Sequence, residues 1–348
     1  MDCAIKPTYR CNLKCLYCCI HETTHAGSQS DLSMDKAMQI VQAVAEKSQN
    51  GNAQIRWHGG EPLCMGFEYF EKLFEFQKHL PVRFDNVVFT NLTLLDDRFL
   101  DLFQKNRVII FTSLDAIESD IDSQRGGHCE RVLERLDALE SAGYTDVTVK
   151  TTVTSVNVNE LEKIYRYLRE KPFEWNFAPV LSAGKGRDHC LTVLPDAQVY
   201  SDMAIKIFNE WVASNKPRVY LFRKVIEELL SSRKPDEVER PMFNVDAQGE
   251  IYKCLQFQGD SDYRVASFRG STSIDDFADY TCEWSSFKFE PCNSCDFTWI
   301  CKFNHCSFLG DCMQRIDRDF TRRYCDIMKP LFHRIQTVVH NELSSVIR

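Results

Sequence analysis

The chain has 348 residues, of which 44% are hydrophobic and 26% charged, the composition of an ordinary soluble globular protein. Its net charge of −8 is spread along the sequence without a basic block, so nucleic-acid binding has no electrostatic support. The sequence has no apolar stretch near the ~18 residues of a membrane span and no signal-peptide core. We therefore expect a cytoplasmic protein without membrane contact.

Short apolar runs alternate with longer amphipathic segments over roughly the first half of the chain. We expect strands at 3–6, 53–57, 87–90, 108–114, 147–153 and 175–180, and helices at 34–46, 67–79, 98–106, 130–142 and 159–169. Six strand–helix units with short connections predict an α/β fold with a parallel sheet, either doubly wound or curled into a partial (β/α)6 TIM-like barrel. In such folds the working loops lie at the carboxyl ends of the strands.

The second half of the chain is less regular. Two helical stretches are expected near 198–214 and 222–232, then a hairpin with Gln248 and Gly249 at its turn, and a closing amphipathic helix near 326–346. The expected division is a partial barrel at 1–190, a helical connection at 191–240, a smaller loop-rich, cysteine-rich domain at 241–330 and a C-terminal helix at 331–348.

Sixteen cysteines are the unusual part of the composition. A cytosolic protein keeps its thiols reduced, so clustered cysteines indicate metal binding. One group lies at residues 11–19 and a second, of eight, lies between residues 254 and 325. The four scattered ones are predicted to be small buried apolar side chains: Cys3, Cys64, Cys129 and Cys190.

Cys11, Cys15 and Cys18 form a C-x3-C-x2-C run directly after the first predicted strand. Three thiolates can hold three irons of a [4Fe–4S] cube, which ordinarily takes four cysteines, and the last iron then stays open. A structural zinc ion usually takes four ligands, often from two C-x2-C-like pairs, and no matching pair lies nearby. Cys19 would close the open iron, so we interpret it as a bystander.

A second motif, His58-Gly59-Gly60-Glu61-Pro62, ends the second predicted strand. Paired glycines let the backbone approach a ligand closely, although Gly-Gly before proline is also an ordinary turn. The combination of this motif with the cysteine run resembles the hallmark pair of the radical S-adenosylmethionine (radical SAM) enzymes.

The resemblance continues over most of residues 4–180. Thr90–Leu95 is similar to the family's Thr-Asn-Gly-Thr-Leu-Leu, with leucine in place of glycine. Ser113-Leu114-Asp115, followed by Asp122 and Arg125, resembles the fourth-strand motif of the anaerobic sulfatase-maturating branch.

This resemblance implies a cofactor and a site. Cys11, Cys15 and Cys18 would ligate a [4Fe–4S] cluster whose open iron binds the amino and carboxylate groups of S-adenosylmethionine. Ser113 would lie near the ribose or the carboxylate of that cofactor. Electron transfer would cleave it to a 5′-deoxyadenosyl radical that abstracts hydrogen from the substrate. The residues bordering the methionine amino group would be Gly59, Gly60, Glu61 and Pro62.

The C-terminal cysteines are similar to those of the SPASM domain, which carries auxiliary [4Fe–4S] clusters. By that resemblance the outer cluster takes Cys292, Cys295, Cys301 and Cys325, and the inner cluster takes Cys254 and Cys306. The cysteine that the family usually has before Gly249 is missing. Cys282 and Cys312 are candidates for the missing inner ligands; otherwise the inner iron is open or that cluster is absent. We therefore expect one or two auxiliary clusters, with a zinc domain as the alternative.

Enzymes that this architecture resembles mostly modify ribosomally made peptides. The sulfatase maturases make formylglycine and carry an aspartate, thought to take a substrate proton, where this chain has Leu255. We therefore expect crosslinking of a precursor peptide, through a carbon–carbon cyclophane or thioether bond, with formylglycine formation, another oxidation or epimerisation as alternatives. A non-catalytic multi-cluster electron-transfer protein and an enzyme for a small metabolite are the competing classes.

The expected partners follow from this chemistry. They are the precursor peptide and an electron donor of flavodoxin or ferredoxin type. Because the first strand begins at residue 3, we expect no N-terminal recognition domain. The peptide leader would then bind this chain directly or through a separate recognition protein.

Overall fold

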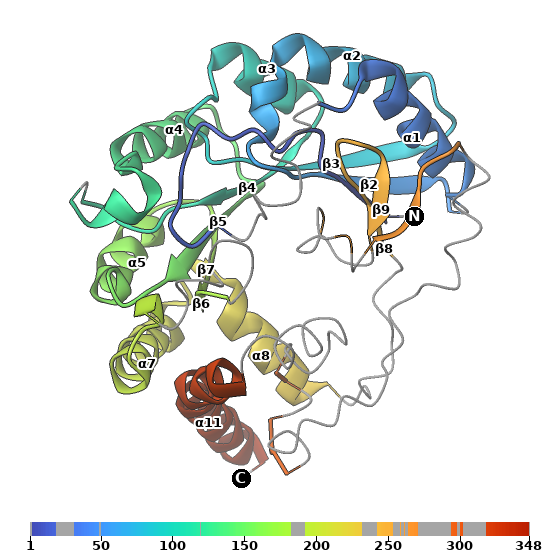
Figure 1. Ribbon diagram of the computed structural model, residues 1–348. Helices are drawn as coiled ribbons and strands as arrows, with labels where there is room; N and C mark the ends of the chain where they lie inside the picture. The colour runs from blue at the N-terminus through green and yellow to red at the C-terminus, as the bar shows by residue number, and fades with distance from the viewer. Residues whose placement is uncertain are drawn as a thin grey trace.

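A single sheet curls through the molecule, and helices cover its outer side (Figure 1). The computed structural model describes residues 2–18, 31–48, 50–118, 120–181, 192–231, 242–252, 258, 261, 264–270, 294–297, 300–301 and 318–347. The strand order is β10-β9-β8-β1-β2-β3-β4-β5-β6-β7. The strands are β1 (Asp2–Ile5), β2 (Asn52–Trp57), β3 (Arg83–Phe89), β4 (Ile109–Ser113), β5 (Val147–Val153), β6 (Glu174–Pro179), β7 (Arg218–Val219), β8 (Met242–Val245), β9 (Glu250–Tyr252) and β10 (Arg264–Ser267).

The helices of the barrel half connect these strands in sequence order. They are α1 (Met34–Glu46), α2 (Phe67–Lys78), α3 (Asp97–Lys105), α4 (Cys129–Ser141), α5 (Leu161–Arg169), α7 (Ala197–Ser214) and α8 (Tyr220–Leu230), with the short 3-10 helices η1 (Pro62–Met65), η2 (Ile121–Arg125) and η3 (Val158–Glu160). Side chains of Ser33, Asp96 and Asp196 cap α1, α3 and α7 by accepting hydrogen bonds from backbone N–H groups of the first turn.

Alternation along the strands separates two faces of the sheet. On β5, Val147, Val149 and Val153 are buried in the core under the helices. Thr148, Lys150 and Thr152 alternate with them and face the concave side of the sheet. Consecutive strands β1 to β7 pair in parallel, so their carboxyl ends meet at one edge. The predicted α/β fold with a partial barrel is confirmed.

The hairpin expected around Gln248 and Gly249 is confirmed by the antiparallel pairing of β8 with β9. β8 also pairs in parallel with β1, so the start of the predicted cysteine-rich domain continues the barrel sheet. Asp246 holds the turn, because its Oδ1 accepts hydrogen bonds from the N–H groups of Gln248 and Glu250 at 2.9 and 2.8 Å. The division into domains stays a prediction.

Two elements differ in extent from the sequence expectation. β3 begins at Arg83 rather than at residue 87, because its polar first residues pair with Asn52–Ile55 of β2. The closing helix α11 spans Arg318–Ile347 and begins before residue 326. It packs against α7 and α8, and Phe297 contacts it through Phe332 and His333. No helix among the described residues is long and apolar enough to cross a membrane.

Candidate functional site

The cysteine loop leaves β1 and runs alongside the Gly-Gly-Glu-Pro segment. The Gly60 N–H donates to the carbonyl of Thr8 at 3.0 Å, and the Glu61 N–H donates to the carbonyl of Arg10 at 2.8 Å. A Cβ atom on Gly60 would lie 2.2 Å from the Arg10 carbonyl oxygen. Glycine is therefore required here by the close approach of two backbones rather than by an unusual φ.

Glu61 joins this segment to the third strand. Its carboxylate is 1% exposed and accepts hydrogen bonds from the Leu63 N–H, the Thr90 hydroxyl and the Asn91 N–H at 3.0, 2.8 and 2.7 Å. Burial raises the pKa of Glu61 to about 7, and the three donors oppose that rise. The carboxylate thus braces the loop against the segment after β3.

The segment after β3 reaches back to the cysteine loop. The Asn91 amide donates to the side-chain oxygen of Asn12 at 2.9 Å, and the Asn12 amide donates to the Thr93 hydroxyl at 2.6 Å. Leu92 is fully buried and has a φ of 64°, the left-handed region in which glycine is favoured. This is the position at which the sequence has leucine where the related motif has glycine, so the backbone shape is kept at a cost of about 1 kcal/mol.

The three cysteines lie on one exposed turn. Cys11 is exposed, Cys15 and Cys18 are half-buried, and the Cys18 N–H donates to the Cys15 carbonyl at 3.3 Å. The Leu13 N–H donates to the Cys11 sulfur at 3.4 Å, and burial raises the pKa of the Cys11 thiol to about 11. Cys64, expected to be a buried apolar side chain, is instead half-exposed and accepts a hydrogen bond from the Asn12 N–H.

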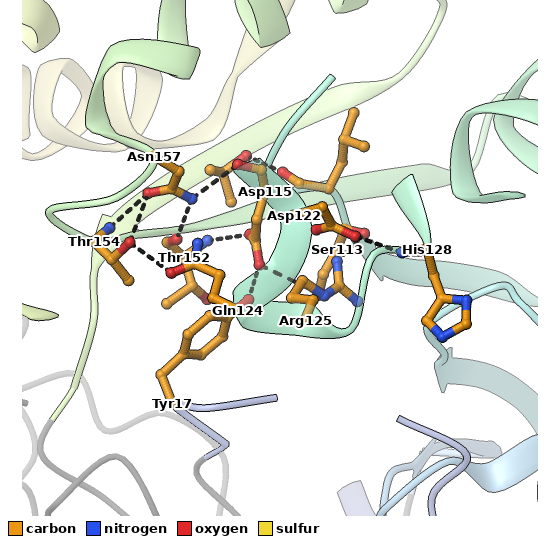
Figure 2. Close-up of polar contacts among 12 residues, drawn as sticks. Tyr17, Ser113, Asp115, Asp122, Gln124, Arg125, His128, Thr152, Thr154 and Asn157 are labelled. Carbon is orange, nitrogen blue, oxygen red and sulfur yellow. Dashed lines mark hydrogen bonds and ion pairs between the residues drawn. The ribbon is translucent and has the colours of Figure 1, made fainter. Parts of the chain in front are cut away.

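A buried polar network at the end of β4 faces this turn (Figure 2). Asp115 is fully buried, and its carboxylate accepts hydrogen bonds from the Tyr17 hydroxyl and, at 2.7 Å, from the Thr152 N–H. The Arg125 Nε lies 3.6 Å from the same carboxylate. Asn157 donates to the Asp115 carbonyl at 2.9 Å. Burial raises the pKa of Asp115 to about 6, and Arg125 opposes that rise.

Arg125 connects the network to the candidate site residues. Its side chain is 7% exposed, donates to the Ser113 carbonyl at 2.6 Å and lies close enough to the Cys15 thiol to interact with it. The neighbouring Gln124 carbonyl accepts the Leu16 N–H at 2.8 Å. The cysteine turn is therefore attached to η2 by the Leu16–Gln124 backbone hydrogen bond and lies beside the Arg125 side chain.

His58 lies on the concave face beside the glycines. Its Nδ1 accepts the Gly59 N–H at 2.7 Å, and its ring centre lies 5.0 Å from that of Phe89. Burial, Lys6 and Lys150 lower the pKa of His58 to about 3, so the imidazole is neutral with its other nitrogen protonated.

These residues fit a [4Fe–4S] cluster better than a single metal ion. Among the described residues no group of three or more His, Cys, Asp and Glu side chains is placed to hold one ion. A cube needs a different arrangement, because each thiolate binds its own iron. Three thiols on one exposed turn, with N–H groups and a guanidinium directed at their sulfurs, satisfy that need.

The comparison with known families shows to which superfamily of enzymes the barrel half is similar. Residues 5–168 match the Radical SAM superfamily. These residues form a radical SAM domain. The match contains the cysteine turn, the Gly-Gly-Glu-Pro segment and the network around Asp115. The predictions of a radical SAM enzyme, of a [4Fe–4S] cluster and of S-adenosylmethionine are confirmed by this family.

The similarity to radical SAM maturases extends beyond that domain. The chain is 25% identical over a 366-residue alignment to the cysteine-type anaerobic sulfatase-maturating enzyme of Clostridium perfringens, covering 97% of this chain and 98% of the relative. It resembles the solved structure of native anSMEcpe with bound AdoMet, with a TM-score of 0.77, 22% identity and coverage of 98% and 99%. SuiB of Streptococcus suis bound to the precursor peptide SuiA has a TM-score of 0.59, 14% identity and coverage of 86% and 70%.

The C-terminal cysteines are described in part. Cys295 and Cys301 pack against the core, and Cys325 is half-buried on α11. Burial raises the pKa of the Tyr324 phenol, and Cys301 and Cys325 lie close enough to raise it further. Cys301 and Cys325 are therefore both close to Tyr324 of α11. The other predicted ligands lie outside the described residues: Cys254, Cys282, Cys292, Cys306 and Cys312.

Proposed function

We propose that this radical SAM enzyme modifies a peptide or a segment of a protein. The main support is the end-to-end similarity to sulfatase-maturating enzymes, since both chains are covered almost completely. Solved structures of anSMEcpe hold AdoMet together with peptides named Kp18Cys and Cp18Cys. Because this chain has a similar length and fold, we expect it to act on the same class of substrate.

The proposed roles begin at the cysteine turn. Cys11, Cys15 and Cys18 would hold the cluster, and Gly59, Gly60, Glu61 and Pro62 would border the methionine amino group through their backbone. When bound, the cluster and S-adenosylmethionine supply an electron and a carbon radical that can abstract hydrogen. The protein keeps the site in place, because Glu61 braces the glycine segment against Thr90 and Asn91. Ser113, whose carbonyl accepts from Arg125, would lie near the ribose or the carboxylate.

We also propose one or two auxiliary [4Fe–4S] clusters in the C-terminal part. Cys295, Cys301 and Cys325 would belong to the outer ligand set, and the proximity of Cys301 and Cys325 to Tyr324 supports this for those two residues. Such a cluster would accept the second electron that a peptide oxidation releases. A flavodoxin- or ferredoxin-type protein is the proposed donor to the first cluster, and a separate recognition protein for the peptide leader is a further proposal.

Two products are proposed. Crosslinking of the peptide is supported by Leu255, because leucine cannot act as the base that formylglycine formation uses; this residue lies outside the described residues. Sulfatase-type maturation is the second candidate, supported by the full-length similarity to enzymes of that name. Mass spectrometry separates them, because a crosslink removes two hydrogens and keeps sulfur, whereas oxidation of cysteine to formylglycine loses sulfur.

The test is an anaerobic assay of the reconstituted, chemically reduced enzyme with S-adenosylmethionine. Peptides encoded beside the gene and cysteine-containing sulfatase peptides are added separately, and 5′-deoxyadenosine and peptide mass are measured. We expect peptide-dependent 5′-deoxyadenosine and a modified peptide. Stimulation by a free metabolite but by no peptide would overturn the peptide assignment.

A further inference from the structure

The guanidinium of Arg125 lies between a predicted cluster ligand and a buried carboxylate. It donates to the Ser113 carbonyl at 2.6 Å, pairs with Asp115 at 3.6 Å, and lies close enough to the Cys15 thiol to interact with it. Figure 2 shows Arg125 and Asp115 within the same polar network. A positive charge is therefore held against one sulfur of the cysteine turn, with a negative charge directly behind it.

The contacts that fix this arrangement come from both sides of the site. The Leu16 N–H donates to the Gln124 carbonyl at 2.8 Å, and the Tyr17 hydroxyl donates to Asp115. Asp115 also accepts the Thr152 N–H, so two hydrogen bonds and the ion pair with Arg125 fix the orientation of its carboxylate. Leu16 follows Cys15 and Gln124 precedes Arg125, so this backbone hydrogen bond keeps Cys15 and Arg125 close together.

The charges around Cys15 have opposing effects. Arg125 places a positive charge beside Cys15, whereas Asp115 and Asp122 place negative charges near it. Lys150 on β5 lies close enough to act on Asp115 as well. The reduction potential of an iron–sulfur cluster depends on net charge and on hydrogen bonds to its sulfurs. Reduction adds an electron, so a nearby cation favours the reduced state and a nearby anion opposes it.

We propose that Arg125 is a positioning residue that raises the reduction potential of the cluster held by Cys11, Cys15 and Cys18, and that Asp115 limits this effect. The proposal rests on the proposed role of Cys15 as a cluster ligand. It gives the fourth-strand motif a function in electron uptake, in addition to any contact of Ser113 with the cofactor. The two residues act in opposite directions although they belong to one network.

The experiment uses the full chain, reconstituted anaerobically, in EPR-monitored redox titrations at alkaline pH, where Asp115 is ionised. Arg125→Gln is expected to lower the midpoint potential and Asp115→Asn to raise it. The expected size is a tenfold change in the ratio of reduced to oxidised cluster, about 59 mV for a one-electron couple. Arg125→Lys should restore part of the lost potential, because lysine keeps the positive charge but lacks the forked N–H donors of the guanidinium. Arg131→Gln, on the exposed side of α4, is the matched control.

Shifts of opposite sign with unchanged iron content support the proposal, because damage to the fold would not move two variants in opposite directions. Unchanged potentials, or shifts in the same direction, overturn it. If Arg125→Gln does not fold, Tyr17→Phe serves instead, because Asp115 then loses a donor and the potential should fall. A wild-type protein that assembles no cluster on this turn overturns the cluster assignment, whereas a cluster with unmoved potentials overturns this inference alone.

Discussion

Tyr17, between two cysteines of the exposed turn, donates its hydroxyl to Asp115, a fully buried carboxylate at the end of β4. The two residues are 98 positions apart in sequence. The contact connects the segment that carries the predicted cluster ligands to the strand that carries Ser113. This contact therefore helps to fix the position of the cysteine turn on the sheet edge.

Replacement of Tyr17 by phenylalanine tests this connection. The variant removes one donor from a buried carboxylate and should lower the free energy of unfolding by about 1–3 kcal/mol. Urea unfolding of the apoprotein measures the effect. Tyr167→Phe is the control, because its hydroxyl donates to Asp137 at an exposed site and should matter little. Equal effects of the two variants would contradict the account.

Glu61 should make the stability of the apoprotein depend on pH. Burial raises its pKa from 4.5 to about 7, so the folded protein keeps a proton that the unfolded chain loses within this window. The contribution of Glu61 to the free energy of unfolding therefore falls as the pH rises from 4.5 to about 7. In Glu61→Gln this dependence is absent, and the free energy of unfolding relative to wild type should increase by up to about 3 kcal/mol from pH 4.5 to 8. Asp115 titrates in both proteins, so its contribution cancels in the difference between them. A difference in the free energy of unfolding that stays constant with pH would contradict the prediction.

Gly60 should tolerate no side chain. A Cβ would lie 2.2 Å from the Arg10 carbonyl, which also accepts the Glu61 N–H, so neither backbone segment can move without losing that bond. Gly60→Ala is expected to cost about 1–3 kcal/mol or more in unfolding experiments. Gly51→Ala provides the comparison, because its φ is positive but its surroundings are open, with an expected cost of about 1 kcal/mol. The prediction fails if the two variants are equally stable.

Cys15, on the cysteine turn, and Cys64, beside it on η1, should differ in iron binding. Cys15→Ala is expected to remove about four irons per chain, the content of one cube. Cys64→Ser should keep them, because Cys64 follows Pro62 on η1 and lies outside the C-x3-C-x2-C run. Iron and sulfide analysis after reconstitution measures both. Loss of the same iron in Cys64→Ser would make Cys64 a ligand.

Periodicity in the sequence predicts the strands and helices of the barrel half to within a few residues. It misses the first residues of β3, since Arg83–Asn86 are held by pairing with β2 rather than by an apolar pattern. Parallel pairing also predicts that the cysteine turn, Gly-Gly-Glu-Pro and Ser113 meet at one edge. The motifs fix the positions of these residues in sequence, and the fold brings them together.

Side-chain partners are beyond such reasoning. The position of Tyr17 inside the cysteine run indicates that it lies near the site, but nothing in the sequence indicates that its partner is Asp115. The carboxylate of Glu61 is buried against Thr90 and Asn91, which a motif cannot reveal. Likewise, β8 pairs with β1 across about 240 positions, and only the folded sheet shows this contact.

The central claim is that Cys11, Cys15 and Cys18 support reductive cleavage of S-adenosylmethionine. The most direct measurement is 5′-deoxyadenosine formation by the anaerobically reconstituted, reduced protein, with Cys15→Ala beside wild type. We predict 5′-deoxyadenosine from the wild-type protein and none above background from the variant. Absence of 5′-deoxyadenosine from a wild-type protein that carries its full iron content would contradict the account.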